Sequence, residues 1–207
     1  MLVNLSLEEF TRRLADGNPT PGGGSASALA GAMGSALVAM YCNLTAGRKK
    51  YASVREEMLE AAAFAGEQQG KFLGLVDRDS AAYEKIVAAN RLAKDSEEEK
   101  TRRAQALDAA SLEATRTPLE TCGVSADLLE RTLSLAAKGN ANALSDLKVG
   151  VELLFTAFSG AKANVEINLP WLPEQAGGEI RAELADLVAR AEQAVGAVRA
   201  EISSLQV

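Results

Sequence analysis

Hydrophobic residues recur at helical spacing along nearly the whole chain. Ser6-Leu7-Glu8-Glu9 has the form of a capping box, and the apolar residues that follow predict a short first helix ending near Asp16-Gly17. A longer apolar stripe marks a last helix over about 174–205, formed by Ile180, Leu184, Leu187, Val188, Ala191, Val195, Val198 and Ile202. Such a face packs along a bundle or against a second subunit.

The same spacing predicts the elements between these two helices. We expect helices over about 26–46, 51–92, 97–116 and 118–138, and an apolar helix through 153–158. Pro118 is expected to separate two of them, and Gly139-Asn140 to form a left-handed C-terminal cap. No strand pattern or internal repeat is present. The sequence therefore predicts one all-α domain over 1–207, an up-and-down bundle of six to seven helices.

A stripe of glycines marks the predicted helix over 51–92. Gly66, Gly70 and Gly74 repeat every fourth residue on one face. Each glycine costs a helix about 1 kcal/mol relative to alanine. We therefore expect this face to be buried against a partner helix.

The stretch 19–25, Pro-Thr-Pro-Gly-Gly-Gly-Ser, leads into a segment rich in alanine and glycine, and no charged side chain lies between Asp16 and Arg48. Ser25 is expected to cap the helix that follows. Free N–H groups at such a helix start attract carboxylates and phosphates, although a simple tight turn is the alternative. The uncharged run is long enough to cross a bilayer, but its small residues favour a buried helix.

Composition narrows the possible functions. The chain carries 22 basic and 28 acidic residues, a net charge of −6, with no basic tail, which argues against nucleic acid and favours a small molecule as the partner. Histidine is absent, which removes Ser-His triads, His-ligated zinc and imidazole catalysis. Cys42 and Cys122 are expected to be small core residues. The N-terminus has no signal-peptide pattern, so we expect a cytoplasmic protein with no membrane partner.

Three polar clusters stand out in this apolar pattern. The first joins the glycine turn to the basic residues 48–50, the second is Asp77-Arg78-Asp79, and the third spans 140–146 with Asn164 and Asn168 further along. Simpler explanations exist for each, because aspartates and asparagines commonly lie on surfaces or cap helices. Two aspartates without further clustered ligands make a poor metal site, so no metal is expected.

Five motifs occur together and in order, at 19–25, 43–51, 75–83, 139–146 and 164–169. In these motifs the chain resembles the formimidoyltetrahydrofolate cyclodeaminase family, which includes the cyclodeaminase half of formimidoyltransferase-cyclodeaminase and stand-alone methenyltetrahydrofolate cyclohydrolases. The resemblance covers nearly the whole chain and implies an all-helical homodimer that binds a folate, including polyglutamylated folates, near the subunit interface. Two features depart from it: no formimidoyltransferase domain precedes this sequence, and the segment 170–173 gives no help in matching the family's C-terminal region.

The resemblance also implies site residues. The cyclodeamination reaction of this family needs two proton movements, one off N10 of the folate and one onto the departing amine. Because histidine is absent, carboxylates are the natural carriers of these protons. We expect Asp79 to be the main acid/base, with its pKa raised by burial, and Asp146 to be the second carboxylate or to orient the pterin. The expected substrate-binding residues are the glycine loop, cations suited to glutamate carboxylates and polar groups suited to a pterin edge: Gly22, Gly23, Gly24, Ser25, Arg48, Lys49, Lys50, Asn140, Asn142, Ser145, Asn164 and Asn168.

The reaction expected first is conversion of 5-formimidoyltetrahydrofolate to 5,10-methenyltetrahydrofolate with release of ammonia; the tetrahydrofolate derivative is then the substrate. Attack of water on the methenyl carbon would instead give 10-formyltetrahydrofolate, the cyclohydrolase reaction, and the sequence does not separate the two. A non-catalytic folate-binding or scaffold dimer is a further alternative. Such a protein would need neither Asp79 in an apolar pattern nor a set of four asparagines.

Overall fold

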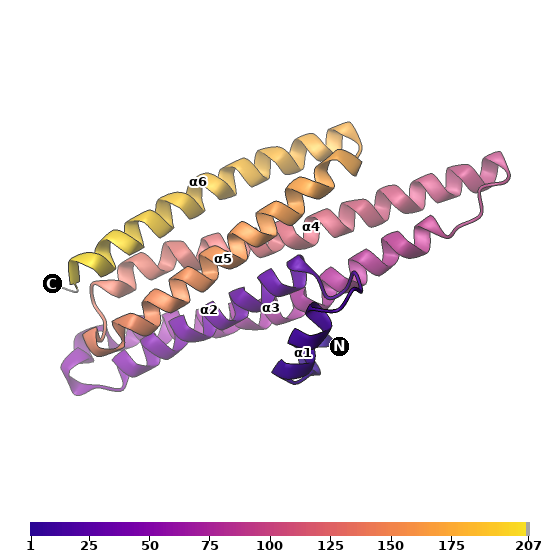
Figure 1. The fold of residues 1–207 in the computed structure, drawn as a ribbon. Helices are drawn as coiled ribbons and strands as arrows, with labels where there is room; N and C mark the ends of the chain where they lie inside the picture. The colour runs from indigo at the N-terminus through magenta and orange to yellow at the C-terminus, as the bar shows by residue number, and fades with distance from the viewer. Residues whose placement is uncertain (206–207) are drawn as a thin grey trace.

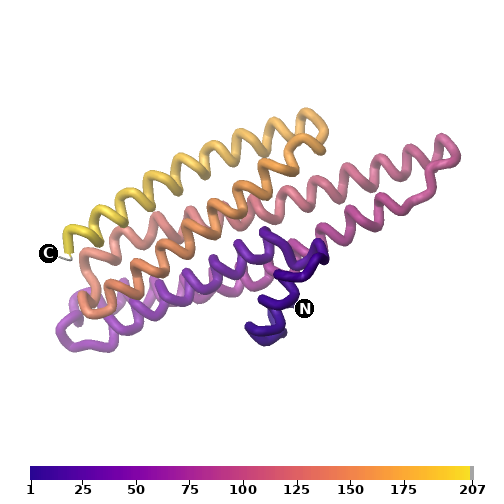
Figure 2. Tube along the Cα trace, viewed as in Figure 1, coloured from indigo at the N-terminus to yellow at the C-terminus, as the bar shows by residue number. Residues whose placement is uncertain are grey.

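The computed structural model describes residues 1–205, and within that range it contains only helices (Figure 1). The α-helices are α1 (Leu7–Leu14), α2 (Gly23–Ala46), α3 (Arg55–Asn90), α4 (Glu97–Ala136), α5 (Leu144–Asn168) and α6 (Glu174–Leu205). Short 3₁₀ helices are η1 (Leu2–Asn4), η2 (Lys49–Val54), η3 (Ala141–Ala143) and η4 (Leu169–Trp171). From α2 to α6 the chain runs alternately up and down, as the trace in Figure 2 shows. This confirms the all-α up-and-down bundle.

Helix α4 continues through Pro118, so the prediction of two separate helices was wrong. Proline lacks the N–H that would bond the carbonyl four residues earlier, which is that of Ala114. In the structure the side-chain amide of Asn168 donates a hydrogen bond of 3.1 Å to this carbonyl. A residue from α5 thus supplies the donor that Pro118 lacks, and the helix continues.

Helix α2 is the central helix of the bundle and packs against both α3 and α5. Its small residues allow this: a Cβ on Gly31 would lie 2.4 Å from the Phe72 ring, and one on Gly34 would lie 2.8 Å from the Gly150 carbonyl oxygen. Ser35 donates a hydrogen bond of 2.5 Å to the carbonyl of α3 residue Ala65. Among the described helices, α2 alone has the length and low charge of a membrane-spanning segment. Since 61% of that stretch is buried in the bundle, its composition also suits a core helix.

One face of α2 remains uncovered. Met33, Met40 and Leu44 are exposed there, and Leu29 and Leu37 on the same face are half-buried. These five residues follow the helical repeat and form a continuous apolar stripe, which we call the α2 outer face. An apolar stripe along the central helix of a bundle is a candidate contact surface.

Two predictions about glycines were wrong. Gly66, Gly70 and Gly74 are exposed, and a Cβ on any of them would meet nothing within 4 Å. No described glycine has a positive φ, so Gly139 forms no left-handed cap. Gly139 instead accommodates Tyr41, because a Cβ there would lie 2.2 Å from the Tyr41 hydroxyl.

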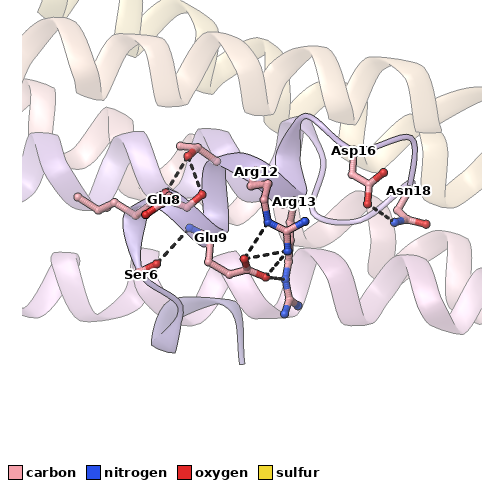
Figure 3. Close-up of polar contacts among 9 residues, drawn as sticks. Ser6, Glu8, Glu9, Arg12, Arg13, Asp16 and Asn18 are labelled. Carbon is pink, nitrogen blue, oxygen red and sulfur yellow. Dashed lines mark hydrogen bonds and ion pairs between the residues drawn. The ribbon is translucent and has the colours of Figure 1, made fainter.

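The N-terminal segment is held beside α3. The Ser6 hydroxyl accepts a hydrogen bond from the Glu9 N–H and caps α1 (Figure 3). The Glu9 carboxylate does not complete a capping box; it binds the guanidinium groups of Arg12 and Arg13. By contrast, Ser96 and Glu99 form the full capping box expected at the start of α4.

Both cysteines are buried and form no disulfide, as expected for core residues. Burial raises the pKa of each thiol to about 12. At neutral pH both therefore remain protonated.

Candidate functional site

The glycine turn begins α2 earlier than predicted. Gly22 occupies the N-cap position and its carbonyl accepts the hydrogen bond of Ala26 N–H, so the helix starts at Gly23. Ser25 therefore lies inside the first turn and does not cap the helix, contrary to the prediction. Its side chain is fully buried and points toward α3 instead.

The carboxylate of Asp79 packs directly on the backbone of this first turn. A Cβ on Gly24 would lie 2.0 Å from Asp79 Oδ1 and 2.6 Å from Asp79 Cγ. No larger residue at position 24 leaves room for the carboxylate in this position. The free N–H groups at the start of α2 therefore already face an anion, and it belongs to the chain itself.

A network of hydroxyl groups surrounds this carboxylate. Ser25 Oγ lies 2.8 Å from Asp79 Oδ2, 3.0 Å from the Val76 carbonyl oxygen and 3.1 Å from Ser80 Oγ. The single proton of Ser25 bonds one acceptor at a time. It can donate to an ionised Asp79, or donate to the Val76 carbonyl while a protonated Asp79 donates to Ser25. The network therefore suits both protonation states of Asp79.

Burial raises the pKa of Asp79 above its ordinary value of 3.8, and hydrogen bonds from the side chain and backbone of Ser25 oppose that rise. This agrees with the pKa expected from its place in an apolar pattern. A carboxyl group whose pKa moves toward neutrality can both accept and donate a proton during a reaction. The arrangement therefore permits acid/base chemistry at Asp79.

Two asparagines of α5 lie at the same end of the bundle. Asn164 Nδ2 is 3.4 Å from the position of a Cβ on Gly23 and donates a hydrogen bond of 2.8 Å to the Gly160 carbonyl. Asn168 lies one turn further along α5. The structure thus brings together eight predicted or neighbouring residues: Gly22, Gly23, Gly24, Ser25, Asp79, Ser80, Asn164 and Asn168. We call this set the Asp79 end.

The other predicted residues lie at the opposite end of α2. The chain leaves α2 at Ala46 and passes through residues 48–50, while the turn into α5 begins at Asn140. The two ends of a 24-residue helix are about 35 Å apart. Residues at this end form the second set, which we call the basic end: Arg48, Lys49, Lys50, Asn140, Asn142, Ser145 and Asp146. Within one chain the two sets cannot contact the same small molecule.

At the basic end, some residues have clear structural roles. The N–H of buried Asn140 donates to Thr45 Oγ1 at 3.0 Å, and its side chain accepts from Asn142 N–H. Asp146 lies in the first turn of α5, where a carboxylate stabilises the helix. Residues 48–50 are exposed cations that form no ion pair within the described chain. They remain free to bind an anion.

Asp77, the neighbour of Asp79 in the second cluster, holds the N-terminal segment, because its carboxylate accepts a hydrogen bond from Leu2 N–H. Residues 1–205 contain no group of three or more side chains placed to hold a metal ion. The motif at 75–83 includes Ser80, but sequence reasoning gave it no role in the site, although its position next to Asp79 on a helix was a usable signal. Sequence reasoning also set aside Trp171, discussed below.

The fold and this site define an all-helical enzyme that places one partly buried carboxylate against a helix N-terminus. The chain matches the Formiminotransferase-cyclodeaminase family over residues 6–189 and belongs to it. It is 37% identical to methenyltetrahydrofolate cyclohydrolase of Methylorubrum extorquens, over 92% of both chains. It is 33% identical to formimidoyltransferase-cyclodeaminase of Sus scrofa, over 92% of this chain and 35% of that protein.

A solved structure supports the same assignment. Formiminotetrahydrofolate cyclodeaminase of Thermotoga maritima superposes with a TM-score of 0.89 at 31% identity, over the full length of both chains. The family expected from the five motifs is thus confirmed.

Proposed function

We propose that the chain acts on the one-carbon bridge between N5 and N10 of a tetrahydrofolate, with Asp79 as the acid/base. The observation that carries this proposal is the Asp79 carboxyl packed on Gly24 and bonded to Ser25, with a raised pKa. The named activities of the relatives supply the substrate class.

Hydrolysis of a methenyl bridge fits this geometry. Ionised Asp79 would attract the cationic methenyl group and remove a proton from the attacking water. After water adds to the carbon, protonated Asp79 would return that proton to N5 as the C–N5 bond breaks. The remaining hydroxyl proton of the adduct would be released to solvent as the C=O bond forms, which yields 10-formyltetrahydrofolate. Ser25 would hold the carboxyl in place in both states, since it can donate or accept.

Deamination uses the same proton cycle. N10 would attack the carbon of the protonated formimidoyl group on N5, and Asp79 would take the N10 proton. The amino group of the adduct would receive that proton and leave as ammonia, and the methenyl bridge would close. The reacting atoms are already in one molecule, so their positioning contributes much of the rate. One carboxyl is sufficient for either reaction, so Asp146 is not required as a second one in the same chain.

We propose hydrolysis as the first activity and deamination as the second. The sequence motifs favoured the reverse order. Hydrolysis is supported by the Methylorubrum relative, which is 37% identical over 92% of both chains. Deamination is supported by the Thermotoga structure, which covers the full chain at 31% identity.

We further propose a homodimer in which the α2 outer faces of two copies pack antiparallel. A two-fold axis near the middle of α2 would place the Asp79 end of one subunit beside the basic end of its partner. Each site would then combine an acid/base from one chain with cations for the glutamate tail from the other. This arrangement accounts for the separation of the predicted residues into two sets about 35 Å apart.

Absorbance of the methenyl group tests the reaction. Purified protein is mixed with 5,10-methenyltetrahydrofolate or with 5-formimidoyltetrahydrofolate. Enzyme-dependent loss of the methenyl absorbance band from 5,10-methenyltetrahydrofolate supports hydrolysis. Growth of that band with release of ammonia from 5-formimidoyltetrahydrofolate supports deamination. The Asp79→Asn variant should lose activity, whereas Asp186→Asn, at an exposed position of α6, should retain it. Full activity of Asp79→Asn would refute the role of Asp79.

Subunit mixing tests the dimer. Asp79→Asn is coexpressed with a variant carrying alanine at residues 48–50, and activity is measured at low substrate concentration. If each site uses both subunits, half the dimers are mixed and hold one intact site, so about a quarter of normal activity returns. If each site lies within one chain, none returns. Sedimentation of Met33→Glu should show monomers, because the α2 outer face would then carry a charge.

A further inference from the structure

A cavity of about 480 Å³ opens next to the Asp79 end. Its lining residues come from α3, α4, the end of α5 and η4. Figure 1 shows that α3 and α4 extend together past the ends of the other helices. The lining of the cavity includes Tyr83, Ile86, Leu107, Asp108, Asn168 and Trp171. Its volume is within the range of small-molecule sites, about 300–1,000 Å³.

Position relates this cavity to the reaction. Tyr83 lies one turn beyond Asp79 along α3, and Asn168 lies one turn beyond Asn164 along α5. One helical turn is about 5.4 Å. A flat bicyclic molecule in the cavity would therefore lie about one helical turn from Asp79 along α3.

The walls of the cavity suit an aromatic ring. Trp171 is the single tryptophan of the chain, and 75% of its surface is exposed. Tyr83 is 40% exposed. Binding of a planar ligand over large aromatic side chains that are exposed to water beside a cavity is favourable, because it removes their apolar surface from water.

Two polar groups of the cavity are acceptors. Asp108 forms no ion pair or hydrogen bond within residues 1–205. Asn168 uses its amide nitrogen for the Ala114 carbonyl, which leaves its amide oxygen as an acceptor. The amino-pyrimidine edge of a pterin presents N–H donors, so a carboxylate and an amide oxygen complement it.

We propose that this cavity binds the pterin ring of the folate, with Trp171 against the ring and Asp108 accepting from its amino-pyrimidine edge. This inference rests on the proposed function, because it takes the substrate to be a folate and places the pterin ring of that folate in the cavity. The glutamate tail then points out of the cavity, toward the cations that the proposed dimer brings from the partner subunit.

The single tryptophan gives a direct test. Binding of 5-formyltetrahydrofolate should reduce acrylamide quenching of Trp171 fluorescence in the unaltered protein. Trp171→Ala and Asp108→Asn should each weaken binding of this probe roughly tenfold or more, measured by calorimetry, because stacking and a charged hydrogen bond are both lost. Trp171→Phe should retain most of the affinity. The matched control is Ile167→Ala, which removes a 71% exposed side chain of the same segment that does not line the cavity.

A tail probe separates ring binding from general damage. Affinity for p-aminobenzoylglutamate, which lacks the pterin, should be the same in Trp171→Ala and the unaltered protein. Unchanged quenching by acrylamide together with unchanged affinity in Trp171→Ala would overturn the assignment of the cavity. If the unaltered protein still converts a folate at a normal rate when both of these results are found, the proposed function stands and only the assignment of the cavity is wrong. If the unaltered protein neither binds nor converts a folate, both proposals fail.

Discussion

Replacing Gly24 by alanine should disable the site without unfolding the protein. The new Cβ would lie 2.0 Å from Asp79 Oδ1 and 2.9 Å from Asp79 Oδ2. These atoms are the end of a side chain, so the carboxylate can rotate away while the backbone stays in place. An unfavourable Asp79 rotamer costs about 0.5–1.5 kcal/mol, and alanine in a helix gains up to about 1 kcal/mol over glycine. The two terms nearly cancel.

The effect of Gly24→Ala on kcat should be much larger than its effect on the free energy of unfolding. A reacting group displaced by about 1 Å can lose a hundredfold in rate, and a rotated Asp79 also loses its bond to Ser25. We therefore expect Gly24→Ala to keep its free energy of unfolding within about 1 kcal/mol while its kcat falls by about two orders of magnitude. Urea denaturation and the methenyl absorbance assay measure the two quantities on the same sample.

Gly70→Ala provides the matched control. Gly70 is exposed in the interior of α3, and its Cβ would meet nothing within 4 Å. This variant should gain about 0.5–1 kcal/mol of stability and keep its kcat. If Gly24→Ala retains normal kcat, the position of the Asp79 carboxylate is not essential and the reasoning about this site is wrong.

Three further variants test the energetics. The pKa of Asp79 is raised above 3.8, so its contribution to stability is complete below about pH 4 and is lost as pH rises through the raised value. The stability of Asp79→Asn relative to the unaltered protein should therefore increase between acid and neutral pH. If the difference in free energy of unfolding between the two proteins stays constant with pH, burial is not the cause of the raised pKa. Asn168→Ala should cost about 1–3 kcal/mol in urea unfolding and less in a Pro118→Ala background, where an N–H is restored to α4; additive effects would refute the compensation. Thr45→Val should cost about 1–3 kcal/mol, because the buried N–H of Asn140 loses its acceptor; an unchanged urea midpoint would argue against this.

Most of the fold followed from the sequence because its helices have clear apolar faces and capping signals. The start of α4 at Ser96 and the last helix over 174–205 are examples. Pro118 was misread because the compensating donor is Asn168, fifty residues away along the chain, and local rules contain no information about it. The glycine stripe of α3 was misread for a similar reason: a repeat of small residues fixes a face but not what lies against it.

The candidate site was predicted in part. Asp79 was identified through the family motif at 75–83 and the absence of histidine, and burial raises its pKa in the structure as expected. The sequence contained no sign that Asp79 and Asp146 lie at opposite ends of the bundle, since motif order does not report distance in space. Trp171 was given no role because segment 170–173 lies outside the five motifs, yet it lines the cavity that Tyr83 and Asn168 also line.

The glycine turn has a structural role in addition to the ligand site that its pattern predicts. Glycines before a helix suggest a site for a ligand anion, but the Asp79 carboxylate already occupies the start of α2. The positive end of the helix dipole favours ionised Asp79, whereas burial favours its neutral form. Burial is the largest effect on this group, so the pKa of Asp79 is raised. A folate tail, which is anionic, would be repelled there, and its carboxylates would be better accommodated by the cations at residues 48–50.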